Sequence, residues 1–244
     1  MSRSATLGNS PTSVRFSLRS PLHSYTVSPV TCDIFIKTCS HDAEYHKYCL
    51  ASIEKYCTGF RNVVVIEGEH PRGYLHQQIV KLHADDHTDA DYVLVTDSDT
   101  LFTVPVTPET YFEGDKVKWI HTPWTPEMLA SNTRAWFDVM GQFFGKTPHS
   151  EFMRRQPFML PAWLLRELRL FCFTKHGVSI EDYIWSKGVF SEFNVLGNFA
   201  WEFHHDRFHW IDSSKDELPE LTTRQFWSHD PVEKNIEEIE RILA

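Results

Sequence analysis

Two aspartates separated by one residue, Asp97 and Asp99, directly follow the apolar run 92–95. Such a run predicts a buried strand, which places both side chains at its carboxyl end. Two carboxylates this close repel one another unless a cation or a basic side chain lies beside them. Oxygen ligands of this kind suit Mg²⁺ or Mn²⁺, and either ion can also bind diphosphate oxygens. The tripeptide Asp97-Ser98-Asp99 therefore predicts a divalent-metal site.

A second tripeptide of the same form, Asp89-Ala90-Asp91, lies in a polar stretch before that strand. About one such tripeptide is expected by chance in a chain of this composition, so context has to separate the two. A solvated turn explains the earlier pair. For the later pair, the alternative is a capped loop in which one aspartate bonds the backbone.

Strands and helices alternate ahead of the later aspartate pair. The patterns predict strands at Cys32–Thr38, Asn62–Ile66 and Tyr92–Thr96, and helices at Asp42–Tyr56 and Tyr74–Ala84. This order indicates βαβ units, an α/β fold and a mostly parallel central sheet flanked by helices. Such sheets bind ligands at the carboxyl ends of their strands, which here are residues 38–42, 67–70 and 97–100.

The second half of the chain is less regular. It predicts strands at Lys118–Thr122 and Phe208–Ile211, and helices at Thr133–Gly145, Pro161–Lys175, Ser179–Ser186, Ser191–Trp201 and Pro231–Leu243. Ser179 and Ser191 are expected to cap their helices. Residues 1–24 are interpreted as a loosely ordered arm. Residues 25–244 are interpreted as one domain, with a more regular half at about 30–122 and a more irregular half at about 123–244.

The composition excludes several classes of protein. The formal net charge of −9 argues against a chain that coats nucleic acid or anionic membrane. Five cysteines without a CxxC pair fit reduced thiols, and no apolar run approaches a membrane span, so a soluble cytoplasmic protein is expected. The phosphate-binding patterns GxxxxGK[ST] and GxGxxG are both absent, which counts against kinases, P-loop enzymes and dinucleotide oxidoreductases.

Three segments carry a resemblance to a known group of proteins. The alternating elements that lead into Asp97-Ser98-Asp99 resemble the nucleotide-sugar half of the GT-A glycosyltransferase fold. Segment 74–102 is more closely similar to a family of uncharacterised bacterial and phage nucleotide-sugar transferases, and segments 151–165 and 191–201 add to that likeness. The resemblance covers roughly residues 33–231. It implies metal-dependent transfer of a sugar from a nucleotide-diphosphate donor, with a UDP-sugar favoured, to a hydroxyl acceptor.

The resemblance also implies roles for individual residues. Asp97 would face the donor's ribose or the Mn²⁺ or Mg²⁺ ion, Asp99 would bind the metal directly, and His229 would be the third metal ligand. Glu192 would face the acceptor and serve as general base. A surface position explains His229 equally well, and the favourable effect of a carboxylate at a helix N-terminus explains Glu192. The pair Glu181-Asp182 is a rival for the acceptor-facing position.

Further residues are candidates for contact with the donor. Gln78 and Lys81 share a helix face, where an amide can read a hydroxyl and a lysine can neutralise a diphosphate. Thr38 and Ser40 follow the first strand, where the fold implied by the resemblance holds the base and ribose. An exposed polar helix face and an ordinary turn are the respective alternatives.

Arg154 and Arg155 are the last candidates for donor contact, because guanidinium groups suit phosphate and could close over it. Ordinary surface arginines are the alternative. Trp124, Trp163 and Trp201 would suit stacking of sugars, although buried tryptophans commonly belong to the core.

Alternative functions stay open from the sequence. A sugar-nucleotide nucleotidyltransferase shares the topology but needs a Gly- and Arg-rich loop after the first strand, and residues 38–42 lack it. A catalytically inactive nucleotide-sugar-binding protein is a further alternative. A non-haem iron oxygenase would use His204, Asp206 and His229 as a facial triad, although the strand–helix alternation counts against its usual barrel. The favoured acceptor is a glycan. Modified DNA is a weaker alternative, and whether the transfer retains or inverts the anomeric carbon stays open.

Overall fold

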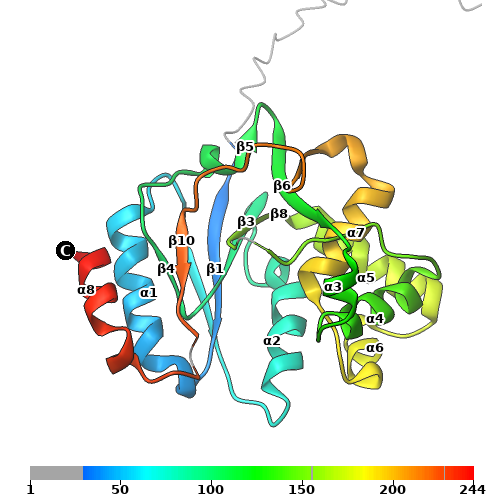
Figure 1. The fold of residues 1–244 in the computed structure, drawn as a ribbon, viewed down its shortest axis with the longest axis horizontal. Helices are drawn as coiled ribbons and strands as arrows, with labels where there is room; N and C mark the ends of the chain where they lie inside the picture. Colours follow the sequence, from blue (N-terminus) through cyan, green and yellow to red (C-terminus); the bar gives the residue numbers. More distant parts are fainter. Residues whose placement is uncertain (1–29, 155, 228) are drawn as a thin grey trace, which may run out of the picture.

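A four-stranded sheet forms the centre of the molecule, in the strand order β2–β1–β3–β8 (Figure 1). The computed structural model describes residues 30–154, 156–227 and 229–244, so the predicted arm at 1–24 lies outside the described residues. Strand β1 (Cys32–Thr38) pairs in parallel with both β2 (Val63–Glu67) and β3 (Tyr92–Asp97). Strand β8 (Phe158–Pro161) runs antiparallel to β3. The predicted α/β fold with a mostly parallel central sheet is confirmed.

Two helices make the crossovers between the parallel strands. Helix α1 (Ala43–Tyr56) joins β1 to β2, and α2 (Gly73–Leu82) joins β2 to β3. Helix α1 lies beside the C-terminal helix α8 (Ile236–Leu243) at one side of the molecule, whereas the helices of the second half gather at the other (Figure 1). Each crossover carries the chain back across the sheet, so β1 and β3 end at the same edge.

The second half of the chain extends the sheet structure and adds a group of helices. Strand β6 (Lys116–Pro123) pairs with β5 (Phe112–Glu113) and β7 (Ser150–Glu151), and in parallel with β9 (Phe208–Asp212). The helices are α3 (Pro126–Leu129), α4 (Arg134–Phe144), α5 (Ala162–His176), α6 (Ile180–Lys187) and α7 (Glu192–Phe203). In the part of the chain that the structure describes, no helix has both the length and the apolar character needed to cross a bilayer. All five cysteines are free thiols.

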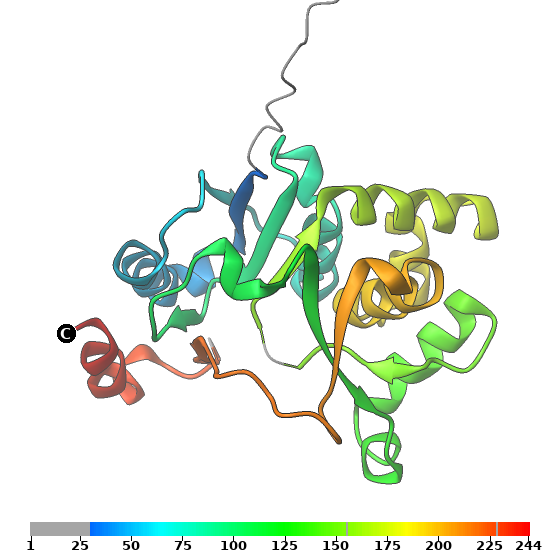
Figure 2. The same cartoon turned by 90° about the horizontal axis from the view of Figure 1, so that it is seen from above.

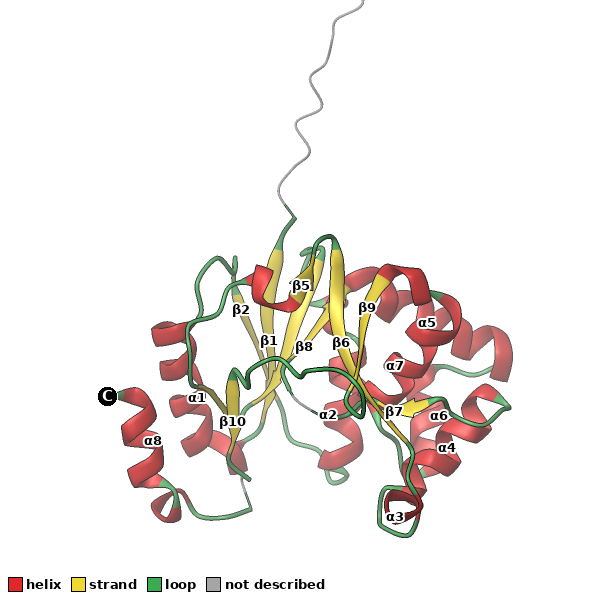
Figure 3. Ribbon diagram, turned by 45° about the horizontal axis from the view of Figure 1, so that its top comes forward, coloured by secondary structure: helices red, strands yellow, loops and turns green. Residues whose placement is uncertain are grey.

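A long segment returns the chain from the second half to the first. It leaves β9, passes across the sheet and reaches β10 (Thr223–Gln225), which pairs with β4 (Thr100–Phe102) just after the Asp97-Ser98-Asp99 tripeptide (Figures 2 and 3). The backbone N–H of Phe226 then donates to the carbonyl oxygen of Asp99 at 2.7 Å. This return places Gln225, Trp227 and His229 beside the carboxyl end of β3.

Helix α7 is a buried scaffold for the strand next to it. Asn194 accepts a hydrogen bond from the N–H of Phe152 at 2.6 Å, and Asn198 accepts one from the N–H of His149 at 2.8 Å. Gly197 lies directly against the Phe152 ring, because a methyl group added at this glycine would overlap the ring's carbon atoms. Glycine at this position therefore lets the helix and the strand approach closely enough for both asparagines to bond.

Substituting Gly197 with alanine is expected to lower the free energy of unfolding by about 1–3 kcal/mol, because the buried Phe152 ring has to move. Urea unfolding measures the loss. Gly141→Ala on α4 is the matched control, since an added methyl group there meets ordinary contact distances beginning at 3.7 Å. Equal stability of the two variants would contradict this account of the helix packing.

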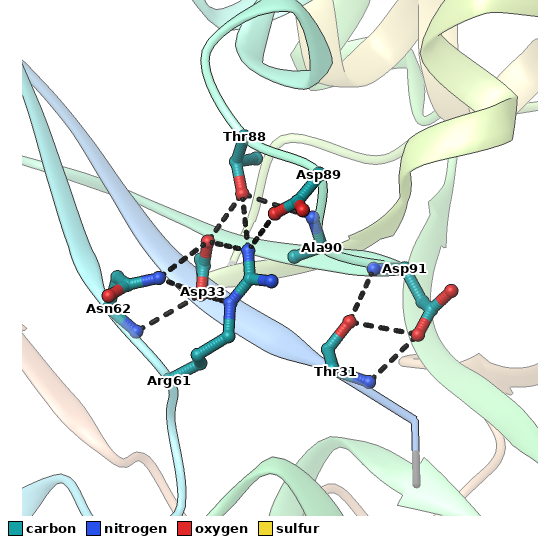
Figure 4. Close-up of polar contacts among 8 residues, drawn as sticks. All are labelled: Thr31, Asp33, Arg61, Asn62, Thr88, Asp89, Ala90 and Asp91. Carbon is teal, nitrogen blue, oxygen red and sulfur yellow. Dashed lines mark hydrogen bonds and ion pairs between the residues drawn. The ribbon is translucent and has the colours of Figure 1, made fainter. Parts of the chain in front are cut away.

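A buried carboxylate locks the opposite, amino end of the sheet (Figure 4). Asp33 accepts two hydrogen bonds from the Arg61 guanidinium, at 3.0 and 2.8 Å, and others from Asn62 and Thr88. Burial opposes the charge of Asp33, but these bonds outweigh it and lower the pKa of the carboxyl. The network joins β1 to the segments that precede β2 and β3.

Asp33→Asn is expected to cost about 1–3 kcal/mol in the free energy of unfolding, because the donors from Arg61, Asn62 and Thr88 lose the buried charged acceptor on which they converge. In the wild type, the Asp33 carboxylate contributes to the free energy of unfolding above its unfolded-state pKa of about 3.9. This contribution is lost as pH falls through the lower folded-state pKa. Unfolding at neutral pH and at low pH checks both parts. Asp91→Asn is the control and should cost less, because this carboxylate is exposed and accepts its hydrogen bonds from Thr31.

Candidate functional site

A cleft of about 1150 Å³ opens at the carboxyl ends of β1 and β3. Both halves of the chain line it. The predicted residues that the structure brings to this cleft are Gln78, Lys81, Asp97, Asp99, Arg154, Glu192 and His229. They come from α2, the end of β3, the segment after β7, the start of α7 and the segment after β10. Residues separated by up to about 150 positions in the sequence therefore share one surface.

Lys81 joins two carboxyl groups at the floor of this cleft. Its Nζ lies 2.5 Å from Oδ1 of Asp97 and 3.2 Å from Oε1 of Glu192. Lys81 is only 2% exposed. Burial disfavours its charge most strongly, but the two carboxyl groups outweigh that effect and raise the pKa of the lysine. Lys81 is therefore a permanent cation that holds the end of β3 against the start of α7.

The two carboxyl oxygens of Glu192 differ in their hydrogen bonding. The residue is 1% exposed, and within the described part of the chain its Oε2 is buried without a hydrogen-bond partner. Burial raises the pKa of this carboxyl, and the nearby charge of Asp97 adds to the effect, while Lys81 opposes it. Such an oxygen, on a residue that lines the cleft, is suited to accept a proton or a hydrogen bond from a group that reaches it.

Gln78 fixes the backbone of Glu192. Its Oε1 accepts the Glu192 N–H at 3.1 Å, and its Nε2 donates to the carbonyl oxygen of Tyr74 at 3.2 Å. The prediction that Ser191 caps α7 is wrong. The Ser191 hydroxyl instead contacts Met153 Sδ and accepts from Asn194, so the Gln78 amide takes the place of the serine oxygen at this helix end. The Ser179 cap of α6 is confirmed, at 3.1 Å from the N–H of Asp182.

The rival acidic pair lies away from the cleft lining. Glu181 Oε1 is 2.5 Å from Nε2 of His83, and Asp182 lies in the first turn of α6 beside the Ser179 cap. Glu192 is therefore the member of the predicted set that borders the cleft.

The two aspartates differ in their surroundings. Asp97 is already bonded on both oxygens, because Oδ2 accepts from Gln156 at 2.5 Å and from Gln225 at 3.4 Å while Oδ1 faces Lys81. Burial raises the pKa of Asp97, but the Lys81 charge and these hydrogen bonds outweigh it and lower the pKa overall. Gln225 also reaches Oδ1 of Asp99 at 3.4 Å, so one amide links the pair.

The donor set fits a hard divalent cation held with few protein ligands. Among residues 30–154, 156–227 and 229–244, no three His, Cys, Asp or Glu side chains gather in a metal-binding arrangement. His229 borders the same cleft and lies on an exposed segment. Mg²⁺ commonly uses one or two carboxylates together with water and substrate phosphates. Asp99, with Asp97 beside it, supplies that kind of incomplete oxygen site.

Of the other residues predicted to contact the donor, some line the cleft and others do not. Thr38 is buried and Ser40 is exposed, and neither side chain lines the cleft. The backbone of Ser40 bonds Glu69 at 2.6 Å. Arg154 does line the cleft, where its Nε donates to Glu151 at 3.1 Å. Arg155 lies outside the described residues.

The histidines proposed for the alternative iron site contact different parts of the protein. His204 Nε2 lies 2.9 Å from Glu167, and His205 packs on the Trp201 and Trp210 rings, whereas His229 borders the cleft. The three tryptophans proposed for sugar stacking also lie elsewhere than the cleft lining. The tryptophans that do line it are Trp136 and Trp227.

Sequence reasoning missed several cleft residues because nothing in their local pattern marks them. Gln156 and Gln225 bond the aspartates from segments that lie about 60 and 130 positions further along the chain. His41 and Asp42 follow β1 and take the positions expected of Thr38 and Ser40. Asp42 accepts a hydrogen bond from the Ser98 hydroxyl at 2.9 Å. The sequence could have indicated this proximity, because the two residues follow the neighbouring parallel strands β1 and β3.

No protein-family model matches this chain, and no curated protein sequence matches it.

Proposed function

We propose that the protein is a metal-dependent glycosyltransferase of the GT-A type, which moves a sugar from a nucleotide-diphosphate donor to a hydroxyl acceptor. The observation that carries the proposal is the single cleft in which Asp97 and Asp99 lie at the end of β3 while Lys81 and Glu192 lie at its floor. The position agrees with the ligand sites of open α/β sheets. The five free thiols favour a cytoplasmic setting.

Charge in the cleft supports the need for a cation. Among the described residues that line it, the acidic side chains outnumber the lysine and arginine side chains: Asp42, Asp97, Asp99, Glu151 and Glu192 stand against Lys81 and Arg154. A diphosphate would be repelled by this surface. Mg²⁺ or Mn²⁺ held by Asp99 and Asp97, with His229 as an added ligand, would supply the positive charge that stabilises the departing diphosphate.

The protein's own side chains account for the rest of the reaction. Lys81 holds Asp97 and Glu192 together beside the cleft. The acceptor oxygen forms a bond to the anomeric carbon as the bond from that carbon to the diphosphate oxygen breaks. Glu192 Oε2 takes the acceptor's proton, which requires its ionised form and corresponds to inversion at the anomeric carbon. A UDP-sugar is the favoured donor and a glycan the favoured acceptor, since the net charge of −9 disfavours DNA.

Asp99→Asn is expected to slow release of the nucleoside diphosphate from its sugar by about 10²–10³-fold, because the charge that develops on the leaving group loses its cation site. The assay follows free UDP, GDP or dTDP from the corresponding sugar nucleotides in Mn²⁺.

Asp89→Asn is the matched control for this assay. It alters the other Asp-x-Asp tripeptide, where the side chain is 91% exposed and pairs with Arg61. Equal rates for the Asp99 and Asp89 variants would contradict the proposed role of Asp99, and absence of cleavage of every sugar nucleotide by the wild type would count against the function.

A further inference from the structure

Two aromatic side chains that line the cleft, Tyr74 and Trp136, are partly accessible and are held in place by hydrogen bonds. The Trp136 Nε1–H donates to the Tyr74 hydroxyl at 3.0 Å, and that hydroxyl donates to the carbonyl oxygen of Phe190 at 2.9 Å. Tyr74 is nevertheless 47% exposed, and both residues line the cleft. These two side chains are called the Tyr74–Trp136 platform.

Hydrogen bonds hold the platform to three parts of the fold. Its hydrogen bonds connect α4 to α2 and to the residue two positions before Glu192, so the rings lose little freedom when a flat or ring-shaped group packs against them. Aromatic side chains with one polar end fixed and one face exposed to a cleft are typical of binding surfaces.

The position of the platform indicates which substrate it meets. A chain of contacts runs from Asp99 through Gln225 to Asp97, and from there through Lys81 to Glu192. Tyr74 joins this chain at its Glu192 end, through Gln78 and Phe190. The hydrogen bonds of the platform therefore attach it to the neighbours of Glu192, the residue that the proposed function assigns to the acceptor.

The spacing of residues along α2 gives the distance between the platform and Lys81. Tyr74, Gln78 and Lys81 follow one another at i, i+4 and i+7, so they share a helix face. Seven residues of helix separate Tyr74 from Lys81 by about 10 Å along the axis. An acceptor that presents a hydroxyl to Glu192 can therefore also contact the platform, provided that it is larger than one sugar ring.

We propose that the Tyr74–Trp136 platform is a stacking subsite for a sugar ring of an oligosaccharide acceptor. The carbon-bound hydrogens on one face of a pyranose present an apolar surface to an aromatic ring, while its hydroxyls stay available to polar neighbours such as Gln77 and Thr133, which line the same cleft. The inference rests on the proposed function, because Glu192 defines the acceptor side. It makes the acceptor a saccharide of at least two rings.

The test measures saccharide binding without a donor. Calorimetric titrations use cello-, chito- and malto-oligosaccharides as probes on the wild type and on Trp136→Ala, Trp136→Phe and Tyr74→Phe. We expect at least one saccharide to bind the wild type. Trp136→Ala should weaken that binding about tenfold, whereas Trp136→Phe should retain most of it because a ring remains. Phe173→Ala, at a 62% exposed ring on α5, should change nothing.

Parallel titrations with UDP and Mn²⁺ separate the possible failures. Unchanged UDP affinity in Trp136→Ala together with weaker saccharide binding supports the subsite. A parallel loss of UDP affinity would show that the platform reads the donor's base, and would overturn it. Equal saccharide affinity in wild type and Trp136→Ala, or no saccharide binding to the wild type, would also overturn it. If UDP fails to bind the wild type while saccharide binding still depends on Trp136, the proposed transferase function fails and the saccharide subsite stands.

Discussion

Lys81→Met is expected to lower the free energy of unfolding at neutral pH by about 3–5 kcal/mol, because it leaves two buried carboxyl groups without their shared cation. In the wild type, Nζ of Lys81 contacts Asp97 at 2.5 Å and Glu192 at 3.2 Å, and Glu192 is almost completely buried. The methionine keeps most of the side-chain volume, so the loss reports the charge rather than a cavity. Urea unfolding at several pH values measures it.

The pH dependence of this variant has a definite sign. Without Lys81, burial raises the folded-state pKa values of Asp97 and Glu192 above their unfolded values of about 3.9 and 4.3. Stability is then fully present below those unfolded values and is lost as pH rises through the raised folded values. The deficit relative to the wild type should therefore shrink as pH is lowered.

Two further variants make the interpretation of Lys81 specific. Lys81→Met combined with Asp97→Asn should recover part of the lost stability, because one uncompensated charge is removed. Lys47→Met, at an exposed lysine paired with Glu44 at 3.7 Å, should cost less than about 1 kcal/mol. A deficit in Lys81→Met that is the same at low and neutral pH would contradict the buried-pair account.

Glu192→Gln is expected to lower the rate of sugar transfer by about 10²–10⁴-fold, which is the usual contribution of a general base. An amide cannot take the acceptor's proton at the position of the unpartnered Oε2. The affinity for the nucleotide should be retained, because Asp99 and its proposed metal are untouched. The measurement compares transfer rates with nucleotide binding in the same preparation.

The neighbouring helix offers a matched control for Glu192. Glu181→Gln changes a glutamate near the start of α6 that pairs with His83 away from the cleft lining, so its transfer rate should stay close to that of the wild type. Glu192→Asp should recover part of the activity with a shifted pH profile, since it restores a carboxylate at a different depth. Equal transfer rates for Glu192→Gln and the wild type would contradict the proposed role of Glu192.

The first half of the fold was predictable because its signals are local and strong. The apolar runs and helical periods placed β1, α1, β2, α2 and β3 within a few residues of their observed bounds. The strands β4, β8 and β10 were not predicted. They are three or four residues long and gain their stability from partners distant in the sequence, and β8 also ends at Pro161. Short strands carry too little periodicity to be recognised.

The candidate site was predictable only in part, for the same physical reason. Asp97 and Asp99 were predictable because they follow a buried strand, whereas Lys81 was a candidate mainly through the resemblance, since its position on the helix before that strand fitted an exposed polar face equally well. The contacts of Gln156 and Gln225 with the aspartates depend on the return of the chain to β4, which leaves no local pattern. The choice of Trp136 over Trp124, Trp163 and Trp201 likewise depends on which helix faces the cleft.

Calorimetric titration of UDP, GDP and dTDP into the wild-type protein tests the central claim most directly. Each titration is made with Mn²⁺, with Mg²⁺ and with EDTA, and is repeated with Asp99→Asn. We predict that one nucleotide binds in the presence of a divalent ion, that EDTA abolishes the binding, and that the variant lacks it. Failure of all three nucleotides to bind under any condition, or binding that is equally tight in EDTA, would contradict the account of the cleft as a metal-dependent donor site.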